Sequence, residues 1–336
     1  MKKLIKVFAA ASLLSISVAS TAMAGTWKQD SEGWRWKEDD HTYTASAWKW
    51  IDSDKDGMAE CYYFNEDGIL VTDTMAPDGR TVNGDGAWTD DGIVRLRAAN
   101  PSVAVQMKKE GALLYKDADR KSSSLPGQDI NADIAMNLYY DWLQIPVIMN
   151  MQMKYHDINT PNMEFLSNST IKTMGMEKVE SSFYTNGCYY SNSKDSGKYK
   201  MKIGYEDMTK HLTLGGLTGQ FWAFLDNVQI AKDQDGNSVM YYSTQAEGLE
   251  PYLNRFYDKV WPSLTDSDFK ITGVAGKALI SPDGYFSKEQ IMISMIITED
   301  GESMGLDMGV DLDYKNPGQT VAIAFPSTDG FDEVVY

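Results

Sequence analysis

The sequence predicts an α+β protein in which a short array of β-hairpins precedes one large, curved antiparallel sheet that packs on a few helices. Three observations support this class. Aromatic pairs and Asp-Gly turns recur near the N-terminus, long stretches of alternating apolar and polar residues follow, and some apolar residues recur at helical spacing. A curved sheet that is closed on one side only would form a half-barrel.

The first 24 residues have the pattern of an export signal. Lys2, Lys3 and Lys6 supply the positive start, an apolar stretch covers 7–18, and Ala22-Met23-Ala24 forms a cleavage site. This stretch is shorter than the roughly 20 residues that a membrane-spanning helix needs. We therefore expect a secreted protein that has no transmembrane segment.

The composition is acidic and poor in cysteine. Against 48 Asp and Glu residues stand 31 Lys and Arg residues, and loss of the three signal lysines leaves 28, so the net charge falls from −17 to −20. Such a surface repels nucleic acid and anionic lipid headgroups, and neither is expected as a partner. Only Cys61 and Cys188 are present, which predicts either two buried thiols or one bridge and favours a Gram-positive origin.

Residues 25–94 contain six of the nine tryptophans and many Gly and Asp residues. Three units share an aromatic pair, a short Asp-Gly turn and a further aromatic residue. Their residues are Gly33-Trp34-Arg35-Trp36 with Tyr43, then Trp48-Lys49-Trp50 with Cys61-Tyr62-Tyr63-Phe64 and Asp67-Gly68, then Pro77-Asp78-Gly79 with Asp85-Gly86-Ala87-Trp88. Asp-Gly between aromatic runs predicts hairpins, and these should stack because an isolated hairpin is marginally stable.

These units resemble the choline-binding or glucan-binding cell-wall repeats of Gram-positive surface proteins. Trp48, Tyr62-Tyr63-Phe64 and Asp67-Gly68 carry the resemblance, whereas Ala47 and Cys61 depart from the family's Gly and Trp. It implies cell-wall association through choline-like groups or glycan, bound by Trp34, Trp36, Trp48, Trp50, Tyr62 and Tyr63. Packing as the core of the array is the alternative role for these rings, and the two roles are compatible.

The segment Asp52-Ser53-Asp54-Lys55-Asp56-Gly57 has the spacing that opens a calcium-binding loop. Glu60 stands at the ninth position, but Tyr63 holds the twelfth, where an EF-hand has Glu. The flanks are strand-like, which excludes an EF-hand. Two alternatives remain: a calcium-stiffened loop with Asp52, Asp54, Asp56 and Glu60 as ligands, or a solvated acidic turn.

Residues 95–336 contain several stretches in which apolar and polar residues alternate, which predicts strands with one apolar and one wet face. Their apolar members are Ile134, Met136, Leu138 and Tyr140; Met151, Met153 and Tyr155; Tyr199, Met201, Ile203 and Tyr205; and Met304, Leu306, Met308, Val310, Leu312 and Tyr314. The segment 183–190 predicts a hairpin because Asn186-Gly187 stands at its centre.

Helices are expected in three places. One begins after Pro101 and covers Ser102–Tyr115. Two more are indicated by helical spacing of apolar residues, namely Leu249, Leu253, Phe256 and Val260, and less regularly Phe221, Phe224, Leu225 and Val228. The order of helix, meander, helices and meander predicts that the helices lie against the concave face of one sheet.

The hairpin at 184–190, the following Lys198-Tyr199-Lys200-Met201-Lys202 and the closing Asn316-Pro317-Gly318-Gln319 and Phe325-Pro326 resemble an uncharacterised family of secreted Gram-positive proteins. That family looks like the LolA/LppX half-barrel of lipoprotein carriers and lipid-binding lipoproteins. The resemblance covers roughly residues 100–336 and implies an apolar cavity for acyl chains. Methionines on the predicted strands suit an irregular apolar ligand, with a filled core as the alternative.

No catalytic constellation is evident in the sequence. His41, His156 and His211 lie far apart, and the common motifs of metalloproteases, serine hydrolases and phosphate loops do not occur. We therefore expect a non-enzymatic surface protein without a cofactor, tethered by residues 25–94, whose domain at 95–336 binds an apolar ligand or a partner protein. Two alternatives are a wall hydrolase with a carboxylate pair and a purely structural adhesion protein. Asp307, Asp311 and Asp313 fit the wet face of a strand better than such a pair.

Overall fold

The computed structural model describes residues 25–141, 143–158, 160–212, 221–244, 249, 268–299 and 302–334. The expected export signal at 1–24 lies outside these residues. The described chain is mostly β, with α2 (Pro101–Ser123) and α3 (Tyr205–Leu212) as its α-helices, so the α+β prediction is wrong. No described helix has both the length and the apolar composition needed to cross a membrane.

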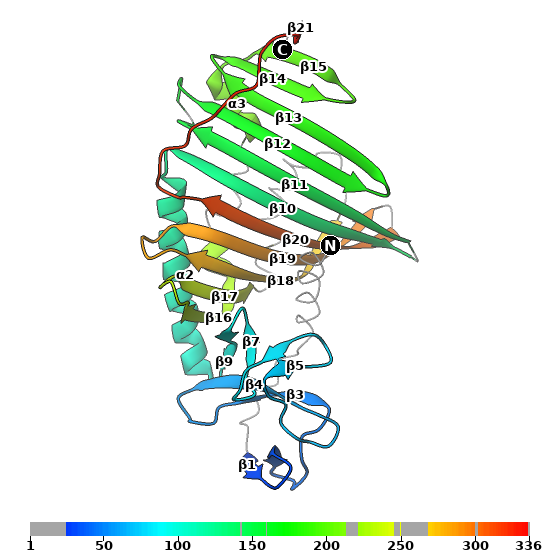
Figure 1. The fold of residues 1–336 in the computed structure, drawn as a ribbon, viewed down its shortest axis with the longest axis vertical. Helices are drawn as coiled ribbons and strands as arrows, with labels where there is room; N and C mark the ends of the chain where they lie inside the picture. Colours follow the sequence, from blue (N-terminus) through cyan, green and yellow to red (C-terminus); the bar gives the residue numbers. More distant parts are fainter. Residues whose placement is uncertain are drawn as a thin grey trace.

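Among the described residues, one 12-stranded sheet forms most of the molecule (Figure 1). In spatial order its strands are β16 (Leu225–Lys232), β17 (Ser238–Thr244), β18 (Asp268–Ile280), β19 (Phe286–Glu299), β20 (Glu302–Lys315), β10 (Gly127–Tyr140), β11 (Leu143–His156), β12 (Glu164–Thr173), β13 (Met176–Thr185), β14 (Cys188–Ser193), β15 (Gly197–Lys202) and β21 (Asp332–Val334). Among the strands that the structure describes, only β15 and β21 pair in parallel. Two antiparallel meanders therefore meet where β20 pairs with β10.

The alternating stretches form strands as predicted, and their register gathers the apolar residues on one face. Met136 of β10 lies opposite Val147 of β11 and Met308 of β20. Residues directly opposite one another share a face, so each strand extends the same apolar surface. The Asn186-Gly187 turn is also confirmed, with φ values of 51° and 75°. One boundary is wrong, because residue 205 begins α3 instead of continuing β15.

Helix α2 begins where the sequence predicts and continues past Tyr115. The side chain of Asn100 accepts the backbone N–H of Val103 at 3.1 Å and so caps the first turn, while Pro101 occupies the first helical position. Gly111 allows α2 to approach β16 closely, since a Cβ there would lie 2.4 Å from Cγ1 of Val228. In Figure 1, α2 crosses the sheet near one end of strands β16 to β20.

The helix predicted from Phe221, Phe224, Leu225 and Val228 is wrong. Residues 221–224 form a 3₁₀ turn, and β16 follows directly. A bulge between Asp226 and Gln229 interrupts the alternation of β16, so its apolar residues fall at helix-like intervals. Of the other predicted helix, Leu253, Phe256 and Val260 lie outside the described residues, and Leu249 is buried.

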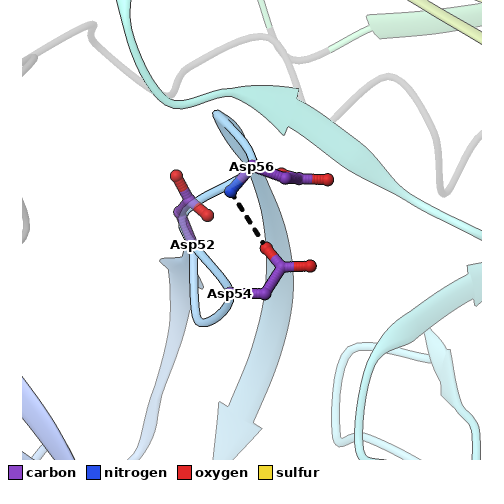
Figure 2. A group of neighbouring side chains, drawn as sticks. All are labelled: Asp52, Asp54 and Asp56. Atoms are coloured by element: carbon purple, nitrogen blue, oxygen red, sulfur yellow. Dashed lines mark hydrogen bonds between the residues drawn. The ribbon is translucent and has the colours of Figure 1, made fainter.

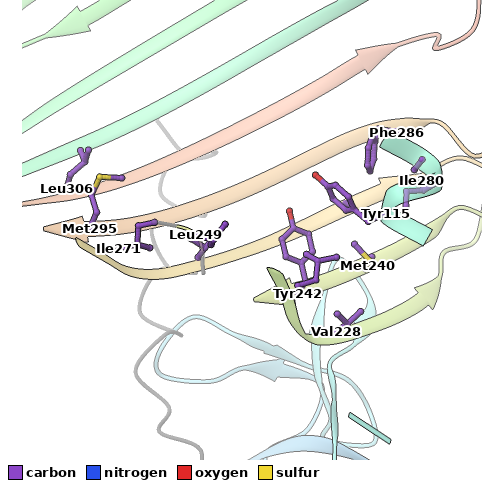
Figure 3. Packing of buried hydrophobic residues seen from close by; sticks show 14 of the residues in the cluster. Tyr115, Val228, Met240, Tyr242, Leu249, Ile271, Ile280, Phe286, Met295 and Leu306 are labelled. Atoms are coloured by element: carbon purple, nitrogen blue, oxygen red, sulfur yellow. The ribbon is translucent and has the colours of Figure 1, made fainter. Parts of the chain in front are cut away.

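Two hydrophobic clusters lie on the face of the sheet that α2 covers, which we call the inner face. The larger cluster lies between α2 and strands β16 to β20 (Figure 3). Within it the ring of Tyr242 lies over Gly276, its partner on β18, where a Cβ would come 2.2 Å from the ring. The smaller cluster packs beside α3 and consists of Met163, Phe165, Tyr184, Ile203 and Met208.

The N-terminal segment forms hairpins, as the Asp-Gly turns predict. Its strands are β1 (Gly25–Gln29) with β2 (Trp34–Glu38); β3 (Ala47–Ile51) with β4 (Met58–Phe64) and β9 (Leu96–Ala98); and a four-stranded sheet of β5 (Thr74–Met75), β6 (Thr81–Val82), β7 (Trp88–Asp90) and β8 (Ile93–Val94). Cys61 is buried in β4 and is a free thiol, as is Cys188, so the disulfide alternative is excluded.

One turn recurs in the array and in the large sheet. At Asn65, Asn83 and Asp233 the side-chain oxygen accepts the backbone N–H groups of the second and fourth following residues. The third following residue is a glycine with φ between 73° and 82°, and its N–H bonds the carbonyl oxygen of the first residue. Only glycine adopts this conformation easily, which explains why Asp-Gly marks these hairpins.

Candidate functional site

The predicted ligand-binding aromatic residues separate into two clusters. The first surrounds Trp27, whose ring centroid lies 6.2 Å from Trp34, 5.3 Å from Trp36, 5.1 Å from Tyr62 and 5.8 Å from Phe64. Trp36 and Phe64 are buried, whereas Trp34 is 44% exposed. The cluster is therefore a small core with one open aromatic side. Trp27 is one of the six tryptophans of this segment but was not predicted to bind a ligand, because it precedes the first recognisable unit.

The second cluster contains Trp48, Trp50 and Tyr63 and is organised around Trp88. The ring centroid of Trp88 lies 6.2 Å from Trp48 and 6.1 Å from Trp50, while Trp48 lies 5.3 Å from Tyr63. The guanidinium of Arg80 lies 5.2 Å from the centroid of Trp48 and 4.8 Å from that of Trp88. No sequence pattern predicted a role for Arg80, although it directly follows the Asp78-Gly79 turn.

Asp52, Asp54 and Asp56 come together as the calcium prediction requires, with potential ligand oxygens within 4.8 Å of one another (Figure 2). Each carboxylate already accepts a backbone N–H of the same loop: Asp54 from Asp56 at 3.2 Å, Asp52 from Gly57 at 3.2 Å and Asp56 from Met58 at 2.7 Å. These bonds fit the acidic-turn alternative. Calcium binding stays a prediction.

Glu60, the fourth predicted calcium ligand, does not belong to this group of three carboxylates. It lies in β4, where it pairs with Ile51 of β3 and Leu96 of β9. Burial raises the pKa of Glu60, and the negative charges of the three loop aspartates raise it further. Because Glu60 lies in β4, it is not grouped with the three aspartates, although the sequence spacing predicted it as a fourth ligand.

The array packs against the outer face of β16 to β18, opposite α2. The side chain of Gln229 is buried; its Nε2 donates to the carbonyl oxygen of Val94 at 2.8 Å, and its Oε1 accepts the N–H of Leu96 at 2.9 Å. The guanidinium of Arg95 lies 3.7 Å from the centroid of Tyr241 and 5.0 Å from that of Trp88. Burial lowers the pKa of Arg95.

This contact between array and sheet includes a partly buried ion pair. Lys277 of β18 lies 3.1 Å from Asp90 and 3.0 Å from Asp91. Burial opposes the charge on Lys277, but the neighbouring carboxylates outweigh it, and the pKa of Lys277 rises to about 12. Coverage of both faces also explains why four consecutive residues of β17, namely Val239 to Tyr242, are buried.

An apolar row on the inner face of β11 lies between the two hydrophobic clusters. We call it the β11 stripe, and it consists of Ile145, Val147, Met149, Met151 and Met153. Within the described chain these side chains are half-buried, and neither cluster includes them. Helix α2 packs instead on β16 and β19. The stripe is thus a methionine-rich apolar surface without a described cover.

In the described part of the chain, two hollows lie near the helix side of the sheet. An open groove of about 430 Å³ lies between α2 and the β18–β19 turn, and its lining includes Leu114, Ala118 and Ile280 together with Arg120 and Lys121. A cavity of about 10 Å³ beside Asp129 and Tyr314 has room for about one water molecule. No methionine lines either hollow, so neither is the methionine-lined cavity that the sequence suggested.

A fully buried carboxyl group, that of Glu289 on β19, lies beside the larger cluster. Tyr115 donates its hydroxyl to Oε1 and Tyr314 donates to Oε2, both at 2.7 Å. Burial raises the pKa of Glu289, although both hydrogen bonds oppose the rise. Nothing in the sequence distinguished this residue from the other acidic residues, because its tyrosine partners lie at distant positions in the chain.

The acidic row on β20 forms the wet face that its alternation predicts. Asp307 accepts the hydroxyl of Ser294 at 2.6 Å, and Asp311 accepts the amide of Gln290 at 2.9 Å. His156 is also engaged, since its Nδ1 lies 3.2 Å from Asp157 and its Nε2 3.1 Å from Glu164. These polar groups pair with one another, and the geometry adds no support for a hydrolase.

The geometry defines a mostly β protein whose described residues include one 12-stranded sheet and an aromatic hairpin array that packs against β16 to β18. No protein-family model and no curated protein matches the chain. Solved structures that it is similar to include LprF from Mycobacterium bovis, with a TM-score of 0.38, 14% identity and coverage of 65% of this chain and 98% of that one. A LolA-superfamily protein from Nitrosomonas europaea has a TM-score of 0.19 and 11% identity over 61% and 94% of the two chains.

The modular Cpl-1 endolysin complexed with a peptidoglycan analogue is a further neighbour, with a TM-score of 0.18 and 15% identity over 54% of this chain and 39% of that one. At these identities and TM-scores the likenesses assign no function.

Proposed function

We propose that this chain is a non-enzymatic, extracytoplasmic binding protein whose sheet takes up an apolar ligand of the acyl-chain type. The observation that carries the proposal is the β11 stripe, a half-buried apolar row between two clusters of buried residues. Covering such a row releases roughly 25 cal/mol for each Å² of apolar surface removed from water. Three of its five members are methionines, whose flexible side chains adapt to irregular ligands.

The test is a titration with a fluorescent fatty acid, combined with mass spectrometry of organic extracts from the purified protein. Met149→Gln with Met151→Gln should weaken binding at least tenfold, because both changes place polar groups on the stripe. Ile148→Gln is the matched control, since Ile148 lies on the same strand but faces the other side. Equal binding by both variants, or no binding by the wild type, would refute the proposal.

The array supplies a second proposal, attachment to the cell wall through the first aromatic cluster. It is favoured by the exposed ring of Trp34, which stands edge-on to Trp27 at 87°. Stacking on a sugar or an ammonium group would use that open side. Wild-type protein should sediment with purified Gram-positive walls, and Trp34→Ala should reduce the bound fraction. Failure of the wild type to sediment would end this proposal without affecting the first.

A further inference from the structure

The second aromatic cluster has the composition of a site for a cation. Trp48 and Trp88 come from different hairpins, β3 and β7, and their rings meet at 58° with centroids 6.2 Å apart. Arg80, which precedes β6, lies over both rings at 5.2 and 4.8 Å. Both distances fall within the roughly 6 Å at which a cation gains from an aromatic face.

Asp78 fixes the cation and one aromatic wall together. Its Oδ2 accepts the indole N–H of Trp48 at 2.8 Å and lies 3.4 Å from Nε of Arg80. Its Oδ1 accepts the backbone N–H of Arg80 at 3.2 Å. The side chain of Arg80 is only 18% exposed. The chain thus supplies walls, cation and counter-charge for the same site.

The first cluster is arranged differently. Its neighbouring guanidinium, that of Arg35, pairs with Asp30 at 2.8 Å and also bonds Glu32. The exposed side of Trp34 is therefore left to solvent, whereas the faces of Trp48 and Trp88 are shared with Arg80. The two clusters contain similar rings, but a guanidinium lies over the rings of the second cluster, whereas Arg35 beside the first cluster pairs with carboxylates.

We propose that the space between Trp48 and Trp88 is a cation-binding cage that the protein keeps filled with its own Arg80. A methylated ammonium ligand could enter only by displacing the guanidinium and leaving Asp78 without its counter-charge. Arg80 therefore links the β5–β8 sheet to the β3–β4 hairpin, and it excludes external ammonium groups from the cage. This inference concerns the cage alone and holds whether or not the first cluster binds the wall.

Removal of the guanidinium should open the cage. The experiment titrates the full chain with choline and with tetramethylammonium and follows tryptophan fluorescence, with Trp34→Ala present throughout to silence the first cluster. Arg80→Ala should bind at least tenfold more tightly than the parent, and adding Trp48→Phe should weaken that binding again. Arg120→Ala, which removes an exposed guanidinium from α2, should behave like the parent.

Methylguanidinium provides a second readout that can be used even when the variant is destabilised. Millimolar methylguanidinium should raise the thermal midpoint of Arg80→Ala, because it refills the cage, and should leave Arg120→Ala unchanged. Tight choline binding by the parent that depends on Trp48 would overturn the proposal. It would also be overturned if Arg80→Ala neither gained binding nor responded to methylguanidinium, whether folded or unfolded.

Discussion

The hydroxyl of Tyr115 on α2 donates a 2.7 Å hydrogen bond to Glu289 on β19, and this buried bond joins the long helix to the sheet. Tyr314 holds the other carboxyl oxygen from β20, while Asp119 of α2 and Tyr242 of β17 also face the group. A carboxyl group in this setting is expected to make stability depend on pH.

The first prediction concerns Glu289→Gln. Burial raises the folded-state pKa of Glu289 above its unfolded value, so its contribution to stability is complete below the unfolded pKa and is lost as pH rises through the folded pKa. Glutamine does not titrate. The free energy of unfolding of the variant, relative to wild type, should therefore increase between pH 4 and pH 7 in urea titrations. Glu110→Gln, an exposed change on α2, should show no such trend, and a flat difference for Glu289→Gln would contradict the assignment.

The second prediction concerns the contact of α2 with β16. Gly111→Ala should destabilise by about 1–3 kcal/mol, because the new Cβ would lie 2.4 Å from Val228 and this clash exceeds the gain in helix propensity. Val228→Ala should cost about 1 kcal/mol for the removed methyl groups. The double variant should be more stable than the sum of the two effects predicts. A strictly additive cycle, measured by urea unfolding, would show that the two residues do not touch.

A third prediction concerns the attachment of the array. Gln229→Ala leaves the N–H of Leu96 and the carbonyl oxygen of Val94 without the bonds that the amide supplies, at a cost of about 1–3 kcal/mol per buried group. Trp88 lies beside this contact and should report its loosening by fluorescence. Gln106→Ala on the exposed side of α2 is the control, and equal stability of both variants would contradict the role of Gln229.

The fourth prediction concerns Lys277. Its raised pKa of about 12 means that its stabilising charge is complete below the ordinary value of 10.5 and is lost only as pH rises through about 12. Lys277→Met should cost about 1 kcal/mol at low salt, and this difference should stay constant from pH 7 to pH 10. Added salt should shrink it, because Asp91 is exposed and screened. A difference that changes with pH in this range would refute the pairing.

Local patterns predicted the strands well. The alternation of Ile134, Met136 and Leu138 is enough to set their shared face, and Asn186-Gly187 is enough to place a hairpin, because both depend on neighbouring residues only. The bulge between Asp226 and Gln229 hid a strand, since one extra residue shifts the period toward that of a helix. A helix was therefore predicted where the structure has β16, and this error contributed to the wrong fold class.

The candidate sites were less predictable because their partners are remote in sequence. The six predicted aromatic residues lie in two clusters, which Trp27 and Trp88 organise, and Arg80 lies over two rings of the second cluster. Glu289 meets tyrosines that lie 174 and 25 residues away. The periodicity of a short segment contains no information about contacts between residues so far apart in the sequence. These contacts are therefore visible only in the folded structure.

The side chain of Gln229 has a consequence beyond holding two parts together. Strand β16 is an edge strand of the large sheet. An edge strand has unpaired backbone groups, to which a strand of another chain can bind. The segment from Val94 to Leu96, bound by that amide, occupies the neighbourhood of this strand. A shortened chain that begins after residue 98 would leave this edge open and is expected to aggregate.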